Sequence, residues 1–107
     1  MPTYNKLIRD RILEIIEANG ATFTIEQLTP ERHAEEIKKK LTEEVTEYQE
    51  AVAGKDAIEE LADILELIYA ALPIHGADYE TLEKVRIAKK EKRGGFEKGH
   101  FLIEVSE

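Results

Sequence analysis

Acidic residues are concentrated between positions 43 and 66. This stretch contains nine acids and a single base, Lys55. Four of the acids form two pairs with a spacing of three residues, and residues at that spacing are neighbours on a helix surface. Carboxylates that occur without histidine or cysteine suit Mg²⁺, with Mn²⁺ as the alternative ion. The two pairs are Glu44 with Glu47 and Glu60 with Asp63.

The repulsion between these acids is the reason to expect a cation among them. Like charges three or four residues apart destabilise a helix by about a few tenths of a kcal/mol, and burying an unpaired carboxylate costs far more. A convergent group of acids is therefore unfavourable unless a cation occupies it. From the residues alone the alternative stays open that these acids lie on solvated helix faces, because glutamate is a good helix former.

A first predicted helix carries Glu44 and Glu47. Thr29 can cap its start, Pro30 suits its first position, and Gly54 ends it. Glu44 falls inside the apolar stripe of this helix. The stripe consists of Ile37, Leu41, Val45, Tyr48 and Val52.

A second predicted helix carries Glu60 and Asp63, which share a face with Leu67. Asp56 followed by Glu59 forms a capping-box pattern at its start, and the helix ends near residues 73–76. The connection from the first helix is short, so the two helices are expected to be antiparallel neighbours. The four acids can then point into the gap between them.

The remaining elements are two helices and two strands. One helix is expected over residues 5–19, with Asn5 as its cap, and another over 78–93, ended by Gly94-Gly95. The alternating apolar residues of segments 22–28 and 100–106 predict two short strands that pair. The predicted fold is mainly α, with four helices and this small β element.

The composition of the whole chain limits the classes of function. The 107 residues predict one domain, residues 1–107, and the absence of cysteine excludes disulfides and thiolate metal sites. A net charge of −8 disfavours a nucleic acid polymer as partner. The lack of a membrane-length apolar run or a secretory signal favours a cytoplasmic protein without a membrane partner. Thin apolar stripes predict that subunits complete the core, which favours a dimer over a monomer.

Four motifs together resemble one known family. The strings "EEVTE" and "ELAD" match the EExxE…ExxD signature of the MazG-like, all-α nucleoside triphosphate pyrophosphohydrolases. "YNKLIRDRI" near the start and "KKEKRGGFEK" near the end resemble the house-cleaning, phosphoribosyl-ATP pyrophosphohydrolase-like branch. The resemblance covers nearly the whole chain.

The resemblance implies a four-helix MazG-like bundle that hydrolyses a nucleoside triphosphate to the monophosphate and pyrophosphate with Mg²⁺. Such enzymes usually assemble as dimers or tetramers. The metal ligands of the motif fall on Glu44, Glu47, Glu60 and Asp63 of this chain. Glu43 matches the first acid of the motif, either as a group in the outer shell of the metal or as the base that activates water, and Glu43 and Glu44 are the candidate catalytic residues.

Four cations are candidates for binding the substrate. Lys89 and Arg93 lie one helical turn apart and could bind phosphate oxygens, the arginine as a bidentate fork. Lys6 and Arg9 could form a second phosphate contact or a subunit contact. The alternative for all four is an ordinary surface cation.

One departure from the family pattern bears on the substrate. The phosphoribosyl-ATP pyrophosphohydrolases of histidine synthesis usually carry Tyr-His soon after the aspartate, whereas Asp63 is followed here by "ILELIY". This difference favours a role in the nucleotide pool. Hydrolysis of phosphoribosyl-ATP stays as one alternative, and a non-catalytic helical oligomerisation module as another.

Overall fold

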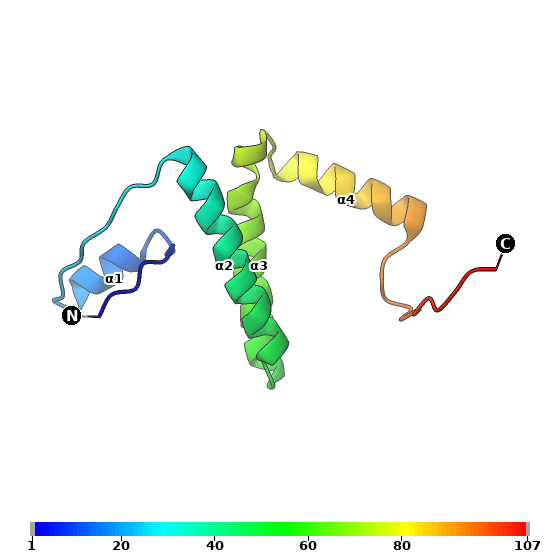
Figure 1. The fold of residues 1–107 in the computed structure, drawn as a ribbon, viewed down its shortest axis with the longest axis horizontal. Helices are drawn as coiled ribbons and strands as arrows, with labels where there is room; N and C mark the ends of the chain where they lie inside the picture. The colour runs from blue at the N-terminus through cyan, green and yellow to red at the C-terminus, as the bar shows by residue number, and fades with distance from the viewer. Residues whose placement is uncertain (1, 107) are drawn as a thin grey trace.

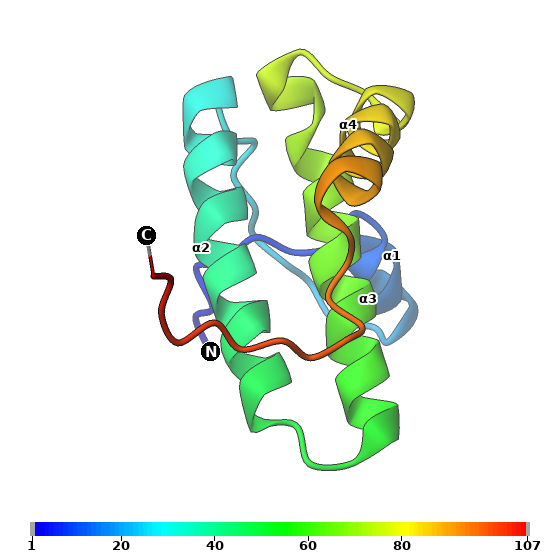
Figure 2. The same ribbon diagram turned by 90° about the vertical axis from the view of Figure 1, so that its right-hand side faces the viewer.

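The fold is described from a computed structural model, in which residues 2–106 are placed. An antiparallel hairpin of two long helices forms its centre, and the other helices project from it (Figures 1 and 2). The molecule extends over 64 × 36 × 22 Å. The elements are α1 (Ile12–Ala18), α2 (Pro30–Glu50), α3 (Gly54–Ala71), a short 3-10 helix η1 (Pro73–His75) and α4 (Tyr79–Arg93). The prediction of a mainly helical protein is confirmed.

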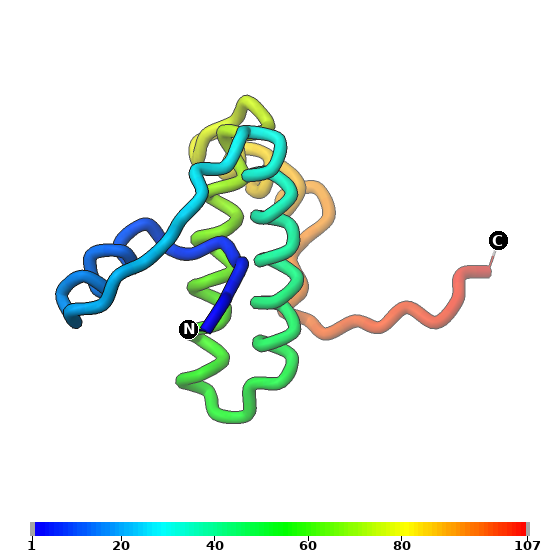
Figure 3. The backbone as a smooth tube through the Cα atoms, turned by 60° about the vertical axis from the view of Figure 1, so that its left-hand side comes forward, coloured from blue at the N-terminus to red at the C-terminus, as the bar shows by residue number. Residues whose placement is uncertain are grey.

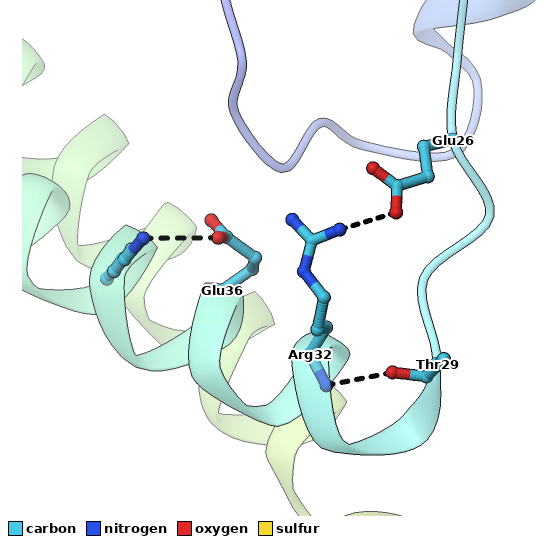
Figure 4. A network of polar contacts seen from close by, with 5 residues as sticks. Glu26, Thr29, Arg32 and Glu36 are labelled. Carbon is cyan, nitrogen blue, oxygen red and sulfur yellow. Dashed lines mark hydrogen bonds and ion pairs between the residues drawn. The ribbon is translucent and has the colours of Figure 1, made fainter.

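The start of α2 follows the sequence prediction. The Thr29 hydroxyl accepts a hydrogen bond from the backbone N–H of Arg32 at 3.3 Å, and Pro30 is the first helical residue. The Arg32 side chain also forms an ion pair with Glu26, so it ties the preceding segment to the first turn of α2 (Figure 4).

The turn between α2 and α3 differs from the prediction. Ala51 and Ala53 have extended backbones, so the chain reverses over residues 51–53. Gly54 therefore begins α3 instead of ending α2. Asp56 lies in the first turn of α3 and does not cap it, although an acid there still favours the positive end of the helix dipole.

Helix α1 is shorter than predicted. It starts at Ile12, and Asn5 has a left-handed φ of 46°, which places Asn5 in a bend and not at a helix cap. The C-terminal end agrees with the prediction, because Gly20 has a φ of 77° and its N–H donates to the Glu17 carbonyl at 2.9 Å.

Helix α4 has the ends that its sequence predicts. The Asp78 carboxylate accepts a hydrogen bond from the Thr81 N–H at 2.8 Å, and Gly94 terminates the helix with a φ of 83°. This helix leaves the C-terminal end of the hairpin and projects away from it (Figure 1). The four helices of one chain therefore do not close into the predicted bundle.

The predicted β element is wrong. Neither segment 22–28 nor segment 100–106 forms a strand among the residues that the structure places. The two segments lie on opposite sides of the hairpin (Figure 3), so neither can supply the backbone partner that the other needs. The apolar side chains of the second segment stay in solvent, with Phe101 89% and Ile103 84% exposed.

One chain buries little of its apolar surface. Ile37 is the one fully buried apolar residue within positions 2–106, and Val52 and Ile58 are 98% and 66% exposed. The radius of gyration is 18.3 Å, against about 13 Å for a compact chain of this length. No helix in the placed part of the chain combines the length and apolar character that crossing a membrane requires.

Candidate metal centre

Three of the four predicted metal ligands converge in the hairpin. Glu44 and Glu47 come from α2 and Glu60 from α3, and one carboxylate oxygen of each lies within 4.8 Å of the others. The antiparallel pairing of the helices brings these side chains together, as the spacing of the acids predicted. Glu47 is exposed, Glu60 is half-buried and Glu44 is buried, so the group opens toward solvent on one side.

Glu44 is an acidic residue whose burial needs a physical explanation. It is only 6% exposed, two helical turns after the buried Ile37. Its Oε2 atom and the Oε2 atom of Glu60 are both buried and lack a hydrogen-bond partner within residues 2–106. Leaving a buried charged oxygen without a partner is costly, and a divalent cation among the three carboxylates would provide that partner.

Protonation is the other way to relieve this repulsion. Burial, and then the nearby carboxyl groups of Glu60 and Glu47, raise the pKa of Glu44 to about 7. The nearby carboxyl of Glu44 lowers the pKa of Glu60, but desolvation and the negative charges of Glu47 and Asp63 outweigh this effect and leave that pKa raised. Two carboxylates can share a hydrogen bond only if one is protonated. Without metal, Glu44 therefore retains a proton below about pH 7.

Asp63, the fourth predicted ligand, lies at the edge of this group. Its Oδ1 atom accepts a hydrogen bond from Nη2 of Arg9 at 2.5 Å, and it does not join the three convergent oxygens. Its negative charge nevertheless contributes to the raised pKa values of Glu44 and Glu60. Asp63 is thus close enough to act on the group electrostatically.

Lys40 is a residue of the site that the sequence interpretation missed. Its ammonium lies 3.2 Å from Oε2 of Glu43 and 3.8 Å from Oε1 of Glu44. The signal was present in the sequence, because a base three and four residues before two acids faces them on a helix. Glu43, a candidate catalytic residue, is half-exposed and lies outside the three convergent oxygens.

Within a single chain, the four predicted substrate-binding cations do not lie together at one place. Arg9 reaches the acidic group through Asp63. Lys6 instead lies over the ring of Tyr4, with Nζ 5.4 Å from the ring centroid. Lys89 and Arg93 belong to α4, which projects away from the hairpin (Figure 1), so they do not reach the carboxylates of their own chain.

Comparison with models of known protein families, with curated proteins and with solved structures finds no match to this chain.

Proposed function

We propose that the protein hydrolyses a nucleoside triphosphate at the α–β bond with Mg²⁺, giving a monophosphate and pyrophosphate. The observation that carries the proposal is the buried carboxylate of Glu44, whose unpartnered oxygen faces two further carboxylates from adjacent helices. Oxygen ligands of this kind suit Mg²⁺ or Mn²⁺. The resemblance of the acidic motifs to the MazG-like enzymes supports the same reaction.

The residues have separate roles in this proposal. Glu44, Glu47 and Glu60 would hold the metal, with Asp63 as the fourth ligand. A divalent ion bound there would neutralise phosphate charge and lower the pKa of a coordinated water. Glu43, a half-exposed acid next to Glu44 in the sequence, would accept the proton from the attacking water. Lys40 then keeps a positive charge beside both Glu43 and Glu44.

A second copy of the chain would complete the molecule. The chain exposes 9759 Å², roughly 3,700 Å² more than a compact protein of 12.2 kDa is expected to expose. An obligate dimer interface typically buries more than about 2,000 Å² in total, so this excess is sufficient for one. The same assembly would bring the cations of a partner's α4 within reach of nucleotide phosphates. We therefore propose a homodimer or a homotetramer.

Exposed apolar residues on the hairpin support an interface between copies at this surface. Large apolar side chains stand at positions i, i+3 and i+7 on α3 and at positions i and i+3 on α2, which is the spacing of one helix face, and one more lies in the turn between the two helices. These side chains are 40–98% exposed in the single chain. They are Val45 and Tyr48 on α2, Val52 in the turn that follows α2, and Ile58, Leu61 and Leu65 on α3.

The test of the activity is pyrophosphate release from a panel of canonical and modified nucleoside triphosphates, with phosphoribosyl-ATP included. We expect release that requires Mg²⁺, and loss of turnover with an intact fold in Glu44→Gln and Asp63→Asn. Glu59→Gln is the matched control, because Glu59 is an exposed acid next to Glu60. Folded protein that releases no pyrophosphate from any substrate would favour the non-catalytic oligomerisation module.

A further inference from the structure

We propose that Arg9 is an internal cation that holds Asp63 while the metal site is empty and releases it when a divalent ion binds. The segment before α1 would then change position with metal occupancy. This inference rests on the metal site of the proposed function and adds a means of regulating it. The observation behind it is the ion pair between Arg9 Nη2 and Asp63 Oδ1 at 2.5 Å, which joins residues 54 positions apart in the sequence.

The position of Asp63 makes Arg9 a competitor of the metal. Asp63 follows Glu60 by one helical turn and acts on the pKa values of both Glu44 and Glu60. Yet one of its oxygens is bonded to a guanidinium and not directed into the group of three carboxylate oxygens. For Asp63 to become the fourth ligand, a metal ion must therefore share or displace this contact.

The exchange is energetically accessible. The Arg9 and Asp63 side chains are 56% and 38% exposed, and ion pairs in water-accessible positions are weak. A divalent ion carries twice the charge of the guanidinium and can interact with several carboxylates at once. The metal therefore has the advantage as soon as its other three ligands are in place.

The release of Arg9 would be transmitted to the N-terminal segment. Within residues 2–106, the pair with Asp63 is the only ion pair or side-chain hydrogen bond that joins the segment before α1 to the α2–α3 hairpin. The Arg9 carbonyl also accepts a hydrogen bond from the Ile12 N–H, at 3.1 Å, where α1 begins. Movement of Arg9 would thus free both the segment and the start of α1 from the hairpin.

A manganese titration tests the competition directly. Free Mn²⁺ is followed by electron paramagnetic resonance in wild type, Arg9→Met and Arg11→Met. Arg11 is the matched control, because it has the same charge two residues away but pairs with Glu14, at 3.8 Å. We expect Arg9→Met to bind Mn²⁺ about two- to five-fold more tightly, as freeing a partly exposed carboxylate predicts, and Arg11→Met to bind like wild type.

Trypsin cleavage provides a second measurement, which follows the accessibility of the chain after Arg9 and not the affinity for the metal. In wild type, cleavage after Arg9 should accelerate when Mn²⁺ is added. In Asp63→Asn, which removes the partner of Arg9, cleavage should be fast with or without the ion. Circular dichroism of each variant checks that the helices remain formed.

The possible failures have different meanings. Equal or weaker Mn²⁺ binding by a folded Arg9→Met would overturn the inference and make Arg9 a support of the site. Tight Mn²⁺ binding without hydrolysis would refute the proposed reaction, while the Arg9 comparison still decides the inference. A wild-type protein that binds no Mn²⁺ would overturn both.

Discussion

At the scale of single residues, a proton and the proposed metal ion would compete for the oxygens of Glu44. The pKa of this carboxyl is about 7 in the folded chain, against an ordinary value of 4.5. Between these values the folded state holds a proton that the unfolded chain releases. The contribution of this proton to the stability of the folded state is therefore complete below about pH 4.5, and it is lost as the pH rises through about 7.

This competition predicts a pH dependence that the metal reverses. Urea unfolding between pH 5 and 8 with EDTA should show that wild type loses stability with rising pH more steeply than Glu44→Gln, because the amide has no proton to lose. Mn²⁺ affinity of wild type should rise over the same interval, because the ion displaces the proton. Parallel pH profiles for wild type and Glu44→Gln would show that Glu44 does not hold this proton.

At the scale of elements, the ends of helices illustrate what the sequence could predict. The cap at Thr29, the cap at Asp78 and the stop at Gly94 are local signals, and the structure contains all three. The convergence of Glu44, Glu47 and Glu60 was also predictable, because it needs only helical spacing and a short turn. These features depend on neighbours along the chain.

Features that depend on distant residues were not predictable in the same way. The pairing of segments 22–28 and 100–106 was inferred from alternation alone, but alternation does not say where a strand finds its partner. The contact between Arg9 and Asp63 follows no sequence spacing. Asn5 resembled a cap but adopts a left-handed bend, in which asparagine is tolerated.

The N-terminal cap of α2 gives a prediction at this scale. Thr29→Ala removes the acceptor of the Arg32 N–H and should lower the free energy of unfolding by about 1 kcal/mol. Thr29→Ser keeps a hydroxyl in the same place and should stay close to wild type. Urea unfolding followed by circular dichroism measures both. Equal losses for alanine and serine would mean that the threonine methyl group, and not the hydrogen bond, matters.

At the scale of the whole molecule, the extended shape of the chain goes together with apolar surface that a single chain does not bury. A radius of gyration of 18.3 Å and a single fully buried apolar side chain among residues 2–106 describe a chain whose core is incomplete. The hydrophobic effect favours covering the exposed stripes of α2 and α3. A second hairpin is a suitable cover, because it presents the same stripes.

Self-association through the hairpin is therefore the prediction that concerns the whole molecule. Wild type should sediment as a dimer or a larger species, and Leu61→Asp should shift it toward monomer, because burying an unpaired carboxylate in an apolar interface is costly. Ala70→Asp is the control, since it adds the same charge at an exposed position of α3 that lies on the opposite side of the helix from Leu61. If wild type sediments as a monomer at every concentration, the exposed stripes must have another cover. In that case a second copy could not supply the phosphate-binding cations that we propose on α4.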